Sequence, residues 1–274
     1  RDVVHEEVSH LRHKRLHGVV GSALEKVYAK KIDEHLGELA YHFLEAGDRD
    51  KALDYFLKAG EKAQKVYAHG EVFSYLQHAL KILEEKEDNL AEKARIAERL
   101  GDTKVWMGEP GSSVEYWTKS LTLWEQLGDK KNIARLHVKV ASGLWDFANE
   151  WEKASEHHRM ALEILEKEPE SVELASLYED ISHMLRRAGK LAEALSWGQK
   201  TYELAERLGS SEVLAKCCYN LTILSTLLGE LEKAKQYHEQ GLRISIENNF
   251  VEQTILSYDA VSYTHLRAHE TVLD

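Results

Sequence analysis

The sequence predicts an all-α protein, an α-solenoid of antiparallel helix pairs that stack into a right-handed superhelix. Only two prolines interrupt the 274 residues, so long helices can form without breaks. Hydrophobic residues make up 43% of the chain and charged residues 30%, a balance typical of folded proteins. A short pattern also recurs at nearly constant spacing, which is the mark of a repeat architecture.

The recurring pattern centres on a small residue that stands five positions after a helix-ending residue. Four clear copies centre on Ala52, Ala154, Ala194 and Ala234, and two degenerate copies centre on Val72 and Ser113. The successive spacings along the chain are 20, 41, 41, 40 and 40 residues. The helix-ending residues are Gly47, Gly108, Asn149, Gly189 and Gly229. Glycine and asparagine tolerate the left-handed conformation that ends a helix. A small centre lets two helices approach closely, and larger residues such as Phe56 follow on the inward face.

Amphipathic periodicity between these stops predicts twelve helices in chain order. They are expected near residues 3–28, 33–46, 49–68, 70–85, 88–107, 111–127, 130–148, 151–166, 170–188, 191–208, 211–228 and 231–247. Turn signals at 128–129, 168–169 and 209–211 separate the units, because glycine and proline end helices and serine and aspartate begin them.

Three parts are expected along the chain: a junction helix over 1–32, a repeat array over 33–260 and a non-native tail over 261–274. The chain opens without Met inside a helical pattern, so we expect an internal fragment with a further domain upstream. The stretch from Val261 to Thr271 breaks the repeat pattern. It can be back-translated into a transposase-type sequencing adapter read in one frame, so we expect that the native protein was cut by sequence assembly after about Ala260.

The residues of the first clear unit resemble the tetratricopeptide repeat. They are Leu39, Phe43, Gly47, Ala52, Phe56 and Ala59. The period of about 40 exceeds the usual 34 and resembles the repeats of MalT-like transcription activators. It also resembles the C-terminal repeats of bacterial signal-transduction (STAND-type) ATPases, including those fused to nucleotide cyclase or kinase domains. Residues 5–85 resemble the junction between nucleotide-binding core and repeats in such ATPases, which implies an ATPase-type domain upstream.

Charge and hydropathy exclude several function classes. The formal net charge is −11, but residues 1–31 carry seven basic and four acidic residues, so the remaining chain carries −14. An acidic array is a poor ligand for phosphate backbones, so we expect no nucleic acid partner. No apolar run approaches the length of a membrane span, so we expect no membrane partner. The two adjacent cysteines form no disulfide framework and favour a reducing cytoplasm.

We expect no catalytic site, no bound metal and no cofactor. No GK[ST] sequence exists to hold phosphates, and His5 and His10 are one residue too far apart for a zinc-binding HExxH helix. A zinc site from His10, His13 and His17 on one helix face competes with a solvated basic helix. Cys217 and Cys218 lie on an inward helical face, where thiols act as small hydrophobic groups.

Binding is expected on the concave face, which the first helix of each pair lines. Register places there Glu98, Asp102, Trp106, Lys139, Asp146, Phe147, Glu179, His183, Arg186, Arg187, Lys216 and Tyr219. Mixed charge with aromatic rings suits a protein or peptide segment in this groove, although any helical array also shows such residues on a solvated surface.

Three functions follow from these observations. The first is a non-catalytic scaffold or ligand sensor, the regulatory repeat region of a multidomain signalling ATPase. The second is a free-standing adaptor that binds peptides as co-chaperones do. The third is a metal- or redox-active helical protein built on the histidines and cysteines. The six tryptophans, all within the repeats, are expected mainly to pack between helices.

Overall fold

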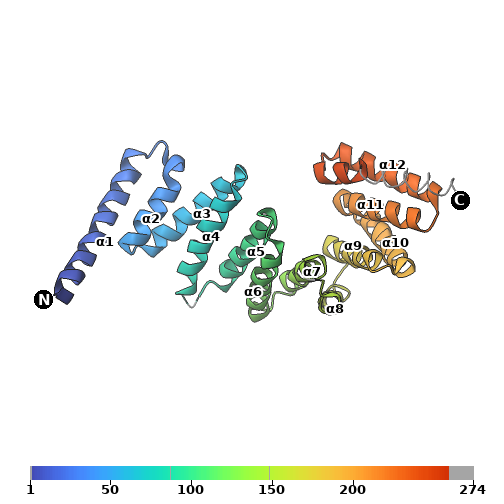
Figure 1. The fold of residues 1–274 in the computed structure, drawn as a ribbon, viewed down its shortest axis with the longest axis horizontal. Helices are drawn as coiled ribbons and strands as arrows, with labels where there is room; N and C mark the ends of the chain where they lie inside the picture. The colour runs from blue at the N-terminus through green and yellow to red at the C-terminus, as the bar shows by residue number, and fades with distance from the viewer. Residues whose placement is uncertain (1, 87, 148, 259–274) are drawn as a thin grey trace. The chain divides into compact units, whose positions relative to one another are not determined.

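The computed structural model describes residues 2–86, 88–147 and 149–258. All regular structure within these ranges is helical and none is strand, which confirms the predicted all-α fold. The chain forms two compact units, Arg1–Leu136 and His137–Asp274. Figure 1 shows the helices in chain order, coloured from blue at the first helix to red at the last. The predicted tail over 261–274 lies outside the described residues.

The first unit is a series of helices, each packed on the next. They are α1 (Asp2–Val27), α2 (Leu36–Ala46), α3 (Arg49–Lys65), α4 (His69–Glu84), α5 (Leu90–Trp106) and α6 (Ser113–Leu127), with short 3-10 turns at Ile32–His35 and Pro110–Ser112. Leu39, Phe56, Leu76 and Leu100 are completely buried between these helices. Helix α7 (Lys130–Phe147) begins in this unit, and the boundary between the units falls within it.

The second unit continues with α8 (Trp151–Leu165), α9 (Val172–Arg187), α10 (Leu191–Leu208), α11 (Ser211–Leu227) and α12 (Leu231–Glu247). Helix α9 packs on α10, α10 on α11 and α11 on α12, and α9 also contacts α11 directly. Such a contact between alternate helices is what stacks one pair on the next. A further helical segment covers residues 251–258, which the sequence pattern did not predict.

The helix ends follow the expected chemistry at most positions. Gly47, Gly108, Gly189 and Gly229 all have positive φ, as does Asn149. At the start of α3, the Asp48 carboxylate accepts the Lys51 backbone N–H at 3.2 Å, which caps the helix. The repeat centres Ala52, Ala154, Ala194 and Ala234 are buried, as is Phe56.

One predicted helix end is wrong by several residues. The sequence pattern predicts a helix over residues 49–68, but the corresponding helix α3 ends at Lys65 and a turn follows. Tyr67 takes a φ of 57° in this turn. No glycine marks the position, so helical periodicity continued through it in the sequence pattern.

Candidate functional site

Within the second unit a cavity opens between α9, α11 and the segment 251–258. Its volume is about 200 Å³. Its lining residues are Glu179, His183, Lys216, Tyr219, Asn220, Glu252, Gln253 and Leu256. The first four are groove residues expected from the sequence. The apolar residues of α9 and α11 face the interior. Helical register therefore places Glu179 and His183 of α9, and Lys216 and Tyr219 of α11, at the cavity.

A line of buried hydrogen bonds holds the floor of this cavity. The Asn220 side chain, which is 1% exposed, donates from its amide to Ser182 Oγ at 2.9 Å. Its carbonyl oxygen accepts from Arg186 Nε at 2.6 Å, and Ser182 Oγ donates to the Ala194 carbonyl at 2.8 Å. Because each buried polar group here has a partner, α9 and α11 are joined at a defined register.

Burial shifts the pKa values of two groups in the cavity wall. Burial, together with the neighbouring Asp180, raises the pKa of Glu179 to about 7. Burial and the positive charge of Arg186 lower the pKa of His183 to about 4. The wall at neutral pH therefore offers a neutral imidazole and a carboxyl group that titrates near neutrality, beside the Lys216 ammonium.

A second polar cluster lies beside this cavity, where α7, α8 and α9 meet. Asp180 accepts hydrogen bonds from Ser142 Oγ and from His158 Nε2, the latter at 2.6 Å. His158 is 3% exposed, and its other ring nitrogen is buried without a hydrogen-bond partner. Ser142 reaches Asp180 rather than the imidazole, so these three groups make a structural link and not the relay that would activate a serine.

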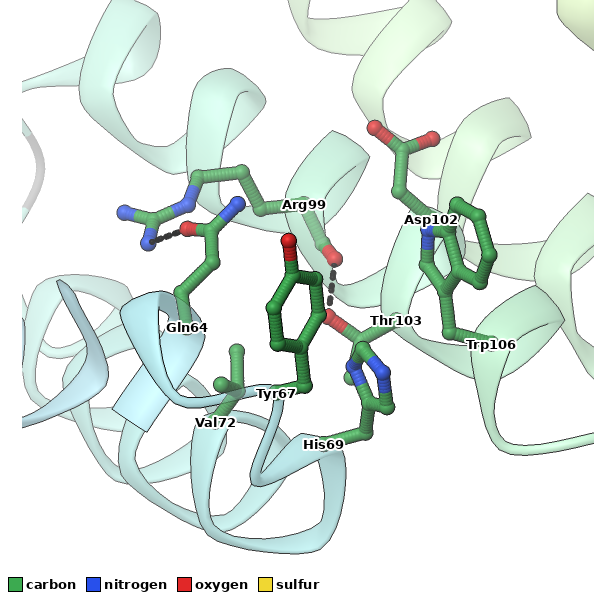
Figure 2. Close-up of a pocket in the computed structure, with 8 residues that line it drawn as sticks. All are labelled: Gln64, Tyr67, His69, Val72, Arg99, Asp102, Thr103 and Trp106. Atoms are coloured by element: carbon green, nitrogen blue, oxygen red, sulfur yellow. Dashed lines mark hydrogen bonds between the residues drawn. The ribbon is translucent and has the colours of Figure 1, made fainter. Parts of the chain in front are cut away.

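The first unit contains a cavity of about 290 Å³ at the turn between α3 and α4, closed on one side by α5. Its lining residues are Gln64, Tyr67, His69, Val72, Arg99, Asp102, Thr103 and Trp106 (Figure 2). Tyr67 is 79% exposed and Trp106 is 70% exposed. The His69 and Trp106 rings lie nearly parallel, with centroids 5.9 Å apart. Asp102 and Trp106, four residues apart on α5, were expected from the sequence; the other six residues were not.

The remaining expected groove residues have other surroundings. Glu98 is only 8% exposed, and both its carboxylate oxygens accept from the Arg135 guanidinium. Asp146 pairs with Arg187 at 3.7 Å, and the Arg187 guanidinium lies over the Trp145 ring. Phe147 is 44% exposed and Lys139 is partly buried. Neither of the last two lines the cavities described above.

The histidines and cysteines considered for metal or redox chemistry have structural surroundings. The rings of His13 and His17 are 4.5 Å apart, and His17 Nδ1 lies 3.1 Å from His42 Nδ1 on α2. The described side chains include no group of three or more potential ligands arranged around a metal position. Cys217 and Cys218 are free thiols that are 1% and 0% exposed, and burial raises the pKa of both. In the part of the chain that the structure describes, no helix combines the length and apolar character that crossing a bilayer requires.

Solved structures of similar fold match most of the chain. Aspartyl phosphate phosphatase F from Bacillus subtilis aligns with a TM-score of 0.65 at 16% identity, over 91% of this chain and 65% of that one. The Rap conjugation gene regulator of plasmid pLS20, solved with the Phr* peptide, aligns with a TM-score of 0.63 at 16% identity, over 84% of this chain and 65% of that one. The apo quorum sensor NprR from B. thuringiensis aligns with a TM-score of 0.63 at 14% identity, over 94% of this chain and 74% of that one. At these identities the likeness establishes the fold alone.

Sequence comparison agrees over part of the second unit. No curated protein matches the chain. Residues 173–247, which run from α9 through α12, match the family model of the tetratricopeptide repeat. That segment includes Ser182 and five of the residues that line the cavity of the second unit, Asn220 among them. The chain therefore contains a tetratricopeptide repeat region.

Proposed function

We propose that this chain is a non-catalytic scaffold that binds an extended peptide segment of a partner protein in the cavity of the second unit. The observation that carries the proposal is the convergence of Glu179, His183, Lys216 and Tyr219 on one cavity beside the buried Asn220 amide. These side chains offer a cation, a titratable acid, neutral hydrogen-bonding groups and an aromatic face. Such a mixture suits a polypeptide, which presents backbone amides and varied side chains together.

The size of the cavity favours a peptide over a small metabolite. A volume of about 200 Å³ is below the roughly 300–1,000 Å³ of typical small-molecule pockets. It can take one or two side chains, while the rest of a bound segment would lie along α9 and α11. The Rap regulator of pLS20, which shares the fold, was solved with a bound Phr* peptide, and this supports a peptide ligand for an array of this kind.

The wider role that we propose is regulatory. Residues 5–85 resemble the junction of signalling ATPases, so the array would follow an upstream ATPase-type domain and work in the cytoplasm. A peptide in the second unit would favour one arrangement of the repeats over another, limited by its difference in affinity for the two. The chain itself should neither bind nor hydrolyse ATP. Calorimetry with ATP and a phosphate-release assay on the purified chain would contradict this role if they showed saturable binding with turnover.

Peptide selection tests the binding proposal. The full chain would be used to select from a randomised display library, and selected peptides would be measured by calorimetry. Lys216→Glu and Tyr219→Ala change exposed or half-buried cavity residues and should each weaken binding at least about fivefold, a loss of roughly 1 kcal/mol. The matched control is Lys235→Glu, an equal charge change at an exposed position on α12. Equal affinities for all three variants would place peptide binding elsewhere.

A further inference from the structure

Tyr67 has an unusual backbone conformation for its residue type. Among the described residues with positive φ, all others are glycine or asparagine. A side chain with a Cβ is strained in the left-handed region, and asparagine is the usual tolerated exception. The Tyr67 ring is 79% exposed, so burial in the core does not compensate for the strain. The left-handed conformation ends α3 with the same backbone hydrogen bonds that Gly47 and Asp48 make after α2, so the turn needs this backbone but not a tyrosine side chain. A strained residue whose side chain is exposed at such a position points toward function.

The exposed ring is one of three aromatic groups that meet at the cavity of the first unit. Tyr67 contacts His69 edge to face at 6.3 Å between centroids, and His69 lies parallel to Trp106. Trp106 is 70% exposed although tryptophan is the largest apolar side chain in the chain. Figure 2 shows the three rings grouped around one opening, with the Asp102 carboxylate beside the Trp106 indole. Val72 and Thr103, both buried, form the floor.

The charges around this opening are arranged asymmetrically. The Arg99 guanidinium donates to Gln64 Oε1 at 3.0 Å. In Figure 2 the Tyr67 ring stands between that pair and Trp106, so the positive group and the Asp102 carboxylate lie on opposite sides of the ring. One oxygen of Asp102 accepts the Trp117 indole N–H at 2.9 Å, which fixes the carboxylate on the aromatic side. The hydrogen bond to Glu98, together with the Asp102 charge, also raises the pKa of the Arg135 guanidinium of α7. That side therefore combines aromatic faces with a fixed carboxylate.

We propose that this aromatic cavity binds an arginine side chain of a partner polypeptide. Aromatic faces attract cations through their quadrupoles, and a guanidinium adds planar stacking on parallel rings such as those of His69 and Trp106. Its N–H groups can donate to the Asp102 carboxylate while its stem covers Val72 and Thr103. The site lies in the first unit and is independent of the peptide cavity in the second.

The test uses acetyl-arginine amide as the probe and acetyl-citrulline amide as its uncharged isostere, both added to the full chain. The readout is the NMR shift of the Trp106 indole N–H, assigned by its loss in Trp106→Phe. A saturable shift with the arginine probe and none with the citrulline probe is expected. An equal response to both would overturn the role of charge. An equal response to acetyl-lysine amide would overturn the role of planar stacking, and no response to any probe would overturn the site.

Two variants separate binding from folding. Asp102→Asn retains an oxygen that can accept from Trp117 but removes the charge, and should lower the affinity for the arginine probe at least about fivefold. In Tyr67→Asn the new side chain suits the left-handed backbone. This variant should bind the arginine probe more weakly, while its melting temperature should equal or exceed that of the parent chain. The control Trp197→Phe changes a partly exposed tryptophan on α10 and should leave probe affinity unchanged. A lower melting temperature with unchanged affinity in Tyr67→Asn would show that Tyr67 serves the fold alone.

Discussion

At the residue scale, glycines within helices have a packing role, whereas glycines at helix ends supply a left-handed backbone conformation. A Cβ built on Gly241 in α12 would lie 2.8 Å from the Cys218 Cβ of α11, and one on Gly198 in α10 would lie 2.7 Å from Leu221. The side chains of Cys218 and Leu221 occupy the space that a Cβ at these two glycines would need. The sequence pattern did not single out these glycines, because their role depends on the neighbouring helix rather than on a local turn.

Gly241→Ala should therefore lower the free energy of unfolding by about 1–3 kcal/mol, because the added methyl overpacks the contact with Cys218. The control is Gly70→Ala in α4, where nothing lies within 4 Å of the added Cβ. That change should raise stability by about 0.4–1 kcal/mol through reduced entropy of the unfolded chain. Urea denaturation measures both. Equal effects at the two positions would mean that α11 and α12 are not in close contact.

Glu179 gives stability a pH dependence of known sign. Its pKa is raised from 4.5 to about 7, so the folded state holds this proton more tightly than the unfolded state does. The stability that the protonated group contributes is present below pH 4.5 and is lost as pH rises through 7. His183 acts oppositely: its pKa is lowered from 6.5 to about 4, so its contribution is present above pH 6.5 and lost as pH falls toward 4.

Glu179→Gln isolates the first of these effects. The glutamine does not titrate, so the variant should gain stability relative to the parent chain as pH rises from 4.5 to 7. Urea midpoints at several pH values within this window would measure the difference. A difference independent of pH would show that the Glu179 carboxyl titrates alike in the folded and unfolded states.

At the scale of the helices, the periodic pattern predicted nearly all that the structure shows. Helices α10 and α12 have the expected bounds, and most others differ by one or two residues. The prediction was least accurate where the repeat spacing shortens to 20 residues, between Ala52 and Val72. There Tyr67 ends α3 without a glycine, and the cavity that it lines with His69 and Arg99 could not be anticipated. The cavity of the second unit, in regular repeats, shares four residues with the expected groove.

The buried alanine centres let the two helices of a pair pack closely. Ala194→Leu should overpack the start of α10 and cost about 1–3 kcal/mol, because this alanine is 0% exposed. The control is Ala192→Leu, two residues earlier in the same helix and exposed, which should change stability by less than about 0.5 kcal/mol. Thermal unfolding followed by circular dichroism compares them. Similar losses in both variants would assign the wrong face of α10 to the interior.

At the scale of the whole molecule, stability should be distributed locally. In a repeat protein each element is held mainly by its neighbours, so a defect spreads only over a short distance. Ala194→Leu should therefore speed amide hydrogen exchange in α9, α10 and α11 while leaving α2 and α3 in the first unit unchanged. Exchange followed by mass spectrometry measures each helix separately. Faster exchange in all of them would show that the chain unfolds as one cooperative body.

The hydrogen bonds between alternate helices bear on how such a chain can grow in evolution. Ser142 donates to Asp180, and the Asn220 amide donates to Ser182. The two serines are 40 residues apart, and so are Asp180 and Asn220. A hydroxyl can donate to a carboxylate or accept from an amide, so the same serine position accommodates either partner. Duplication or loss of a gene segment encoding one whole repeat would join a serine to a compatible partner again, and the array could change its length in single steps without new interior contacts.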